Sequence, residues 1–121
     1  MDFLKDLARS LYERRHEAVV VPYEDRSDGQ FQPARNDCHR NVEAWCRLHP
    51  SHRPVRGWLV LDYSEQRRYR FMAHSLVEDE EGHRFDLTAY TGHPFLEFEG
   101  VEEEFVLLMS ARQLTHVDHN F

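Results

Sequence analysis

The stretch around which the chain is organised reads Asn36-Asp37-Cys38-His39-Arg40-Asn41-Val42-Glu43-Ala44-Trp45. We expect a helix from about residue 37 to 48, because Asn36 or Asp37 can cap its first turn and two prolines, Pro50 and Pro54, follow it. Cys38 would then lie in the first turn, where unpaired N–H groups and the helix dipole favour a thiolate. The sequence therefore marks Cys38 as a candidate nucleophile.

Length and charge limit the classes of partner. The chain has 121 residues, of which 40% are hydrophobic, and this fits a single domain spanning residues 1–121. Residues 1–61 carry 10 Lys/Arg and 9 Asp/Glu, whereas residues 62–121 carry 5 and 13, so the two parts have net charges of +1 and -8. An acidic balance argues against nucleic acid, which binds basic surfaces. It leaves small molecules, peptides and basic proteins as partners.

The sequence gives no sign of a membrane span. No apolar run reaches the roughly 18–20 residues that a span needs, and Met1-Asp2-Phe3-Leu4-Lys5-Asp6 lacks the pattern of a signal peptide. We therefore expect a cytoplasmic protein that does not bind membranes. Cys38 and Cys46 would lie about 12 Å apart on one helix, too far for a disulfide, so both thiols should be free. Cys46 shares the inward side of that helix with Val42 and is expected to pack in the core.

Helical and alternating patterns predict an α+β fold, with helices packed on a small antiparallel sheet. Apolar residues recur at helical spacing over residues 2–16. Strands are expected over residues 55–63, 69–77 and 84–88, with a turn at Asp79-Glu80-Glu81-Gly82, and another strand over Glu104–Met109. The segment from Thr91 to Gly100 is expected to be irregular or a short edge strand, and residues 110–121 a helical tail.

His74 and Asp86 lie on the second and third predicted strands. If the hairpin turns near Gly82, His74 faces residues 86–88, and Asp86 lies within its reach. Both positions are even-numbered, so a regular register puts both side chains on the same face of the sheet. A histidine that accepts the proton of a cysteine and is held by a carboxylate is the arrangement that activates a thiol nucleophile.

The order Cys38, His74, Asp86 resembles that of the papain-like cysteine fold, and within it the transglutaminase-like branch. The resemblance covers about residues 30–90, and its most specific part is Ala73-His74-Ser75-Leu76-Val77-Glu78-Asp79-Glu80-Glu81-Gly82-His83-Arg84-Phe85-Asp86-Leu87-Thr88. It implies a papain-like or transglutaminase-like core, with Cys38 as nucleophile, His74 as general base and acid, and Asp86 as orienting group. Gln32 stands six residues before Cys38, which is the spacing of the papain-like oxyanion glutamine. Gln30 and Asn36 are rivals for that role.

Other histidines suggest a second base or a metal site. His39 is either a second base or an exposed helix residue. The pairs His49/His52 and His116/His119 are each spaced by three, yet no pair of cysteines has the tight spacing of a structural zinc site. We expect no metal and no other cofactor. A metal-dependent protein that uses Cys38, His74 and Asp86 as ligands is the competing hypothesis.

These residues predict a thiol-dependent hydrolase or acyltransferase that acts on an amide, a peptide or a glutamine side chain. A cysteine peptidase or amidase and a transglutaminase-like enzyme are both compatible with the set. The alternative is a non-enzymatic acidic binding module on the same scaffold, because residues 62–121 carry a net charge of -8 and a chain of 121 residues leaves little room for substrate-specificity elements.

Overall fold

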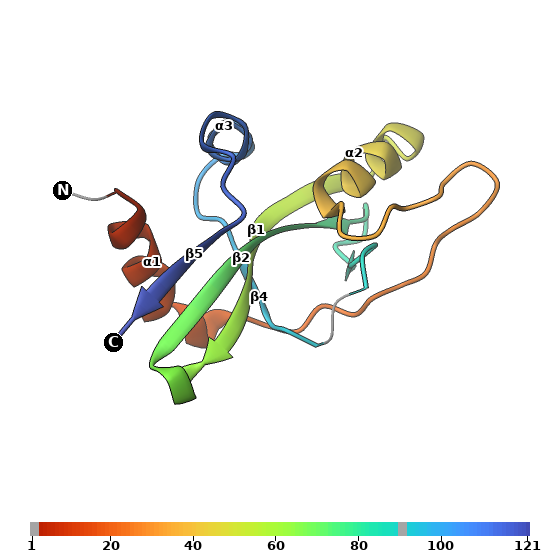
Figure 1. Cartoon of the computed structure of the whole chain (residues 1–121). Helices are drawn as coiled ribbons and strands as arrows, with labels where there is room; N and C mark the ends of the chain where they lie inside the picture. Colours follow the sequence, from red (N-terminus) through yellow and green to blue (C-terminus); the bar gives the residue numbers. More distant parts are fainter. Residues whose placement is uncertain (1–2, 90–91) are drawn as a thin grey trace. The chain divides into compact units, whose positions relative to one another are not determined.

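The computed structural model describes residues 3–89 and 92–121, and it has the mixed α+β composition predicted from the sequence (Figure 1). The predicted start of the first helix at residue 2 and the predicted segment start at Thr91 lie outside the described residues. The elements follow in the order α1 (Phe3–Glu13), the 3-10 helix η1 (Arg15–Glu17), α2 (Cys38–Leu48), β1 (Arg53–Tyr63), the 3-10 helix η2 (Ser64–Gln66), β2 (Arg68–Glu78), β3 (Arg84–Phe85), β4 (Phe95–Glu97), α3 (Glu102–Arg112) and β5 (His116–Asn120).

The strands form one five-stranded sheet built around the long neighbouring strands β1 and β2. The order along the sheet is β3-β2-β1-β4, and β5 also pairs with β2. β3 is antiparallel to the end of β2, with Val77 opposite Phe85 and Glu78 opposite Arg84. This is the register predicted from the turn, where Gly82 adopts a φ of 84° that favours glycine. β5 pairs with β2 over Arg68 to Met72.

The C-terminal part of the sequence prediction was wrong. The segment predicted as the strand Glu104–Met109 belongs to α3, and the predicted helical tail contains β5. A short apolar run has no periodicity that separates strand from helix. Three acidic residues in the first turn of α3, Glu102, Glu103 and Glu104, favour the helix through its dipole. β5 forms because it pairs with β2, a partner far away in sequence.

The chain forms two compact units. One contains Met1–Val20, Gly57–Ala73 and His93–Phe121, and the other contains Val21–Arg56 and His74–Gly92. We call them unit 1 and unit 2; the single domain over residues 1–121 stays a prediction. The buried core of unit 1 contains Ala8, Leu11, Trp58, Val60, Phe71, Ala73, Leu96, Phe105 and Val117. That of unit 2 contains Phe31, Val42, Trp45, Val77, Phe85 and Leu87.

The helices agree with the amphipathic patterns that predicted them. Ala8 and Leu11 of α1 are buried, as are Val42 and Trp45 of α2. Cys46 is half-buried against the core of unit 2, and neither Cys38 nor Cys46 belongs to a disulfide, as predicted. Within residues 3–89 and 92–121, no helix is both long and apolar enough to cross a membrane.

Candidate active site

Cys38 is the first residue of α2, and its side chain is only 6% exposed. Asp37 holds the N-cap position, because its carbonyl accepts the first intrahelical bond from the Asn41 N–H at 2.9 Å. Its carboxylate, however, forms no capping hydrogen bond with the described residues, which corrects the predicted side-chain cap. Asn36 instead adopts a left-handed φ of 59°. The first N–H groups of α2 therefore receive no hydrogen bond from the Asp37 carboxylate.

Asn41 fixes the loop that leads into Cys38. Its Oδ1 accepts the Ala34 N–H at 2.8 Å, and its Nδ2 donates to the Ala34 carbonyl at 2.8 Å and to Thr88 Oγ1 at 3.0 Å. Asn41 is buried, so these bonds replace those it would make with water. This role of Asn41 was not predicted from the sequence. The available signal was that Asn41 lies one helical turn after Cys38, on the same side of the helix.

Asp86 holds His74 in a fully buried position on β2. The His74 Nε2 and Asp86 Oδ2 atoms are 2.5 Å apart, and no part of the His74 side chain is exposed. The other carboxylate oxygen of Asp86 accepts the Thr88 N–H at 3.0 Å. The Asp86 backbone bonds to Pro22 and Glu24. Asp86 is thus placed by residues 22–24 as well as by the β2–β3 hairpin.

The imidazole of His74 and the thiol of Cys38 act on each other electrostatically, and each shifts the pKa of the other. The hydrogen bond to Asp86 uses Nε2, so Nδ1 is the other nitrogen of the buried ring. Unit 2 therefore brings together the three residues that the sequence predicted as a triad, Cys38, His74 and Asp86. They come from the start of α2, from β2 and from the residue after β3.

The charges of the two partners favour a thiolate and an imidazolium. Burial raises the pKa of the Cys38 thiol, but hydrogen bonds from His39 and His74 outweigh it and lower the pKa from 9.0 to about 6. Burial lowers the pKa of His74, but the hydrogen bonds and negative charges of Asp86 and Cys38 raise it from 6.5 to about 9. Between about pH 6 and pH 9 the sulfur is therefore anionic while the imidazole carries a proton.

His39 approaches the same sulfur from α2 and is half-buried. This corrects the interpretation of His39 as an exposed helix residue. Its Nδ1 lies 2.6 Å from Ser75 Oγ, and the same oxygen accepts a hydrogen bond from Arg56 Nη1 at 2.8 Å. The sequence did not single out Ser75 or Arg56 as part of the site, because a serine and an arginine in a strand give no local sign of the contacts they make there.

The predicted oxyanion residue, Gln32, lies in the loop before α2. Its side chain is exposed, and its Nε2 donates to the Asp28 carbonyl at 2.5 Å. Asn36 is exposed, and the Gln30 N–H donates to the Asp28 carboxylate at 2.8 Å. The amide of Gln32 is therefore used within its own loop, and its part in oxyanion binding stays a prediction.

The spaced histidines take part in aromatic packing. His49 stacks on Trp45 with ring centroids 3.8 Å apart, and His52 Nδ1 accepts the Trp45 Nε1–H at 3.0 Å. His119 stacks on Tyr12 at 4.3 Å. In the part of the chain that the structure describes, no three His, Cys, Asp or Glu side chains are grouped to hold a metal ion.

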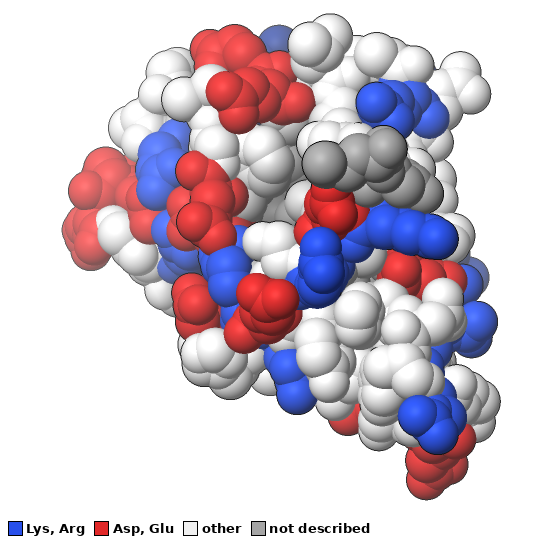
Figure 2. All heavy atoms as spheres, turned by 90° about the vertical axis from the view of Figure 1, so that its left-hand side faces the viewer, with Lys and Arg blue, Asp and Glu red and all other residues white. Residues whose placement is uncertain are grey.

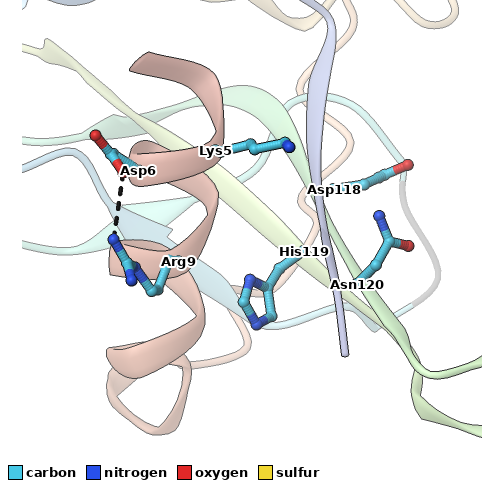
Figure 3. A pocket seen from close by; sticks show the side chains of 6 residues that line it. All are labelled: Lys5, Asp6, Arg9, Asp118, His119 and Asn120. Carbon is cyan, nitrogen blue, oxygen red and sulfur yellow. Dashed lines mark hydrogen bonds and ion pairs between the residues drawn. The ribbon is translucent and has the colours of Figure 1, made fainter. Parts of the chain in front are cut away.

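A polar hollow of about 480 Å³ lies in unit 1 between α1 and β5, away from Cys38 in the sequence (Figure 3). Lys5, Asp6 and Arg9 line it from the helix, and Asp118, His119 and Asn120 from the strand. Asp6 pairs with Arg9 at 3.3 Å, and Asp118 pairs with Arg70 at 2.8 Å. These carboxylates are already neutralised, and no cysteine lines the hollow, so its chemistry differs from that of the Cys38 site.

Figure 2 shows one face of the molecule, on which basic and acidic side chains are interspersed and neither positive nor negative charge covers the whole face.

No family model, curated protein or solved structure matches this chain.

Proposed function

We propose that this protein is a thiol-dependent hydrolase or acyltransferase that acts on amides through Cys38, His74 and Asp86, on a papain-like or transglutaminase-like core. The observation that carries the proposal is that one buried imidazole, that of His74, is held by a carboxylate 2.5 Å away and interacts electrostatically with a thiol at a helix start. This arrangement supplies a nucleophile, a proton carrier and an orienting group.

In the first half of the reaction the Cys38 thiolate attacks the carbonyl carbon of the amide. A C–S bond forms, and the electron pair of the C=O bond moves to oxygen. When the tetrahedral intermediate collapses, the C–N bond breaks, and the His74 imidazolium gives its proton to the leaving amine. The products of this half are a free amine, a neutral His74 and a thioester on Cys38.

In the second half neutral His74 removes a proton from water or from an acceptor amine. The activated oxygen or nitrogen attacks the thioester carbonyl, the C–S bond breaks, and Cys38 leaves as the thiolate. Water gives a carboxylic acid, and an amine gives a new amide. Asp86 holds the imidazole in one orientation throughout and stabilises its charged form.

The backbone N–H of Cys38 is suited to bind the oxyanion. It lies at the start of α2, where the Asp37 carboxylate provides no cap. A backbone donor fixed by a helix stabilises the charge that develops on the carbonyl oxygen. Because the Cys38 side chain is only 6% exposed, a slim group such as the primary carboxamide of a glutamine side chain fits this site better than a branched one.

Acylation of the protein by p-nitrophenyl acetate tests the proposal. In a Cys46→Ser background, we expect a burst of one equivalent of nitrophenolate, an acetyl group on Cys38 by peptide mass mapping, and continued turnover that hydroxylamine accelerates. In the His74→Gln variant, Cys38 should be acetylated slowly and should keep its acetyl group. Acetylation of lysines alone, or equal nitrophenolate release by a folded Cys38→Ser variant, would refute the proposal.

A second candidate function, the binding of a basic protein segment, is favoured by one observation on α3. Val106 and Leu107 are exposed beside the three glutamates at the start of this helix. A shallow hollow of about 310 Å³ is lined there by Glu102, Glu103, Val106, Leu107 and Ser110. Apolar side chains flanked by carboxylates fit a segment with lysine and leucine on one helical face.

A fluorescent peptide of alternating leucine and lysine pairs, titrated at low and high salt, tests this candidate. Leu107→Ser should weaken binding at least about fivefold, whereas Leu48→Ser, at another exposed leucine, should leave it unchanged. Binding that is insensitive to salt and to Leu107→Ser would count against it.

A further inference from the structure

The buried side chain of Asn41 takes part in hydrogen bonds whose directions are fixed. The Ala34 N–H can only donate, so the Asn41 atom that lies 2.8 Å from it is the carbonyl oxygen Oδ1. The Ala34 carbonyl can only accept, so the atom 2.8 Å from it is the amide nitrogen Nδ2. These two contacts settle which way the amide of Asn41 faces. Nδ2 therefore uses its second hydrogen to donate to Thr88 Oγ1, which lies 3.0 Å away.

Thr88 connects this amide to the carboxylate of Asp86. The Thr88 hydroxyl is held by Asn41, and the Thr88 backbone N–H donates to Asp86 Oδ1 at 3.0 Å. The other carboxylate oxygen, Oδ2, lies 2.5 Å from His74 Nε2. All four side chains in this chain of contacts are buried. A member that loses its partner there is left with an unsatisfied polar atom, so the contacts hold one another in place.

These contacts join the segment of the nucleophile to the segment of the orienting carboxylate. Asn41 lies three residues after Cys38 on α2, and its two bonds to Ala34 hold the loop before that helix. β3 ends at Phe85, so its pairing with β2 stops before Thr88. The hydrogen bond from Asn41 therefore ties the residues that follow β3 to α2, and both segments belong to unit 2.

We propose that Thr88 is a positioning residue for the Asp86–His74 pair, and that its hydroxyl acts by accepting the hydrogen bond from Asn41. This inference rests on the function proposed above, and it assigns Thr88 no contact with the substrate. A carboxylate that is held at one oxygen keeps the direction of the other, and a reacting group stays in its productive orientation when the residues behind it are fixed. Without the contact to Asn41, Thr88 and the carboxylate that it holds gain freedom, and the bond to Nε2 weakens.

An NMR titration of the histidine ring nitrogens tests the proposal without any substrate. Thr88→Val removes the hydroxyl at nearly constant volume and keeps the backbone N–H. We expect the pKa of His74 to fall by about one pH unit, because the negative charge that raises it is held less closely. Thr88→Ser restores the hydroxyl and should return this pKa to within about 0.3 unit of the parent. Thr115→Val, the same change at an exposed threonine of unit 1, is the control and should leave it unchanged.

The outcomes separate positioning from a role in stability alone. If Thr88→Val lowers the midpoint of urea unfolding but leaves the pKa of His74 at its parent value, the proposal is overturned. A fall in this pKa that Thr88→Ser fails to reverse also overturns it, because the hydroxyl would then not be the cause. If Thr88→Val does not fold, Thr88→Ala decides: a lowered pKa supports the proposal, and an unchanged one overturns it. The titration follows only the imidazole, so a failure to turn over p-nitrophenyl acetate would count against the proposed function alone.

Discussion

Replacing Asp86 by asparagine tests the interaction that gives the site its charge. Asparagine preserves the size of the side chain and can still accept the Thr88 N–H, but it removes the negative charge 2.5 Å from His74 Nε2. Burial lowers the pKa of His74, and of the two side chains that raise it only Cys38 remains in this variant. We therefore expect the pKa of His74 to fall, so that the Cys38 thiolate loses stabilisation from the imidazolium.

The magnitude follows from the pKa of His74. Its rise from 6.5 to about 9 in the folded protein corresponds to about 3 kcal/mol, and removing one partner of a buried ion pair costs a similar amount. Because folding raises the pKa of His74, this side chain contributes its full stabilisation to the folded protein below about pH 6.5. The contribution is lost as the pH rises through about 9. Asp86→Asn should therefore cost about 3 kcal/mol at pH 6 and less than about 1 kcal/mol at pH 10.

Urea unfolding at the two pH values, followed by tryptophan fluorescence, measures this difference. With a slope of about 1.5 kcal/mol/M, the midpoint should fall by about 2 M at pH 6. Asp6→Asn, which removes a carboxylate from a surface pair with Arg9, is the matched control and should change stability by less than about 0.5 kcal/mol at both pH values. An equal loss of stability for Asp86→Asn at pH 6 and pH 10 would refute the reasoning.

Three further predictions concern the same chain. The kcat/KM for p-nitrophenyl acetate should rise through about pH 6 and fall through about pH 9, since the reaction needs the Cys38 thiolate and the His74 imidazolium together; a profile that keeps rising to pH 10 would contradict this. Asn41→Ala should cost about 2–4 kcal/mol in urea unfolding because the buried Asn41 side chain loses three hydrogen bonds, and a cost below about 1 kcal/mol would contradict their role. Gly57→Ala should cost about 1–3 kcal/mol because its new Cβ meets the Leu96 carbonyl, whereas Gly29→Ala, with open space around it, should change stability little; equal effects would contradict the packing.

The core of the candidate site was predictable from local patterns. The cap-like residues before Cys38 located the start of α2, and the turn at Gly82 set the register of β2 and β3. From that register and the alternation of side chains, the proximity of His74 and Asp86 followed without any tertiary information. Short-range rules sufficed because a hairpin joins residues that are close in sequence.

The residues missed by the sequence analysis depend on long-range contacts. Ser75 and Arg56 acquire their roles only when β1 and β2 lie side by side and α2 brings His39 to the same place. Likewise, residues 116–120 become a strand because they pair with β2, and this tertiary partner overrides a weak local preference. A buried polar side chain is identified by its partners, and a linear sequence does not show them.

The pH dependence of Cys38 alkylation tests the central claim most directly. With iodoacetamide in a Cys46→Ser background, we predict that the rate rises with a midpoint near pH 6 and then stays level to about pH 9, because the thiolate of Cys38 is already formed in the resting site. A midpoint near the value of about 8.5 that is usual for a free cysteine would contradict the account, because Cys38 would then be an ordinary thiol.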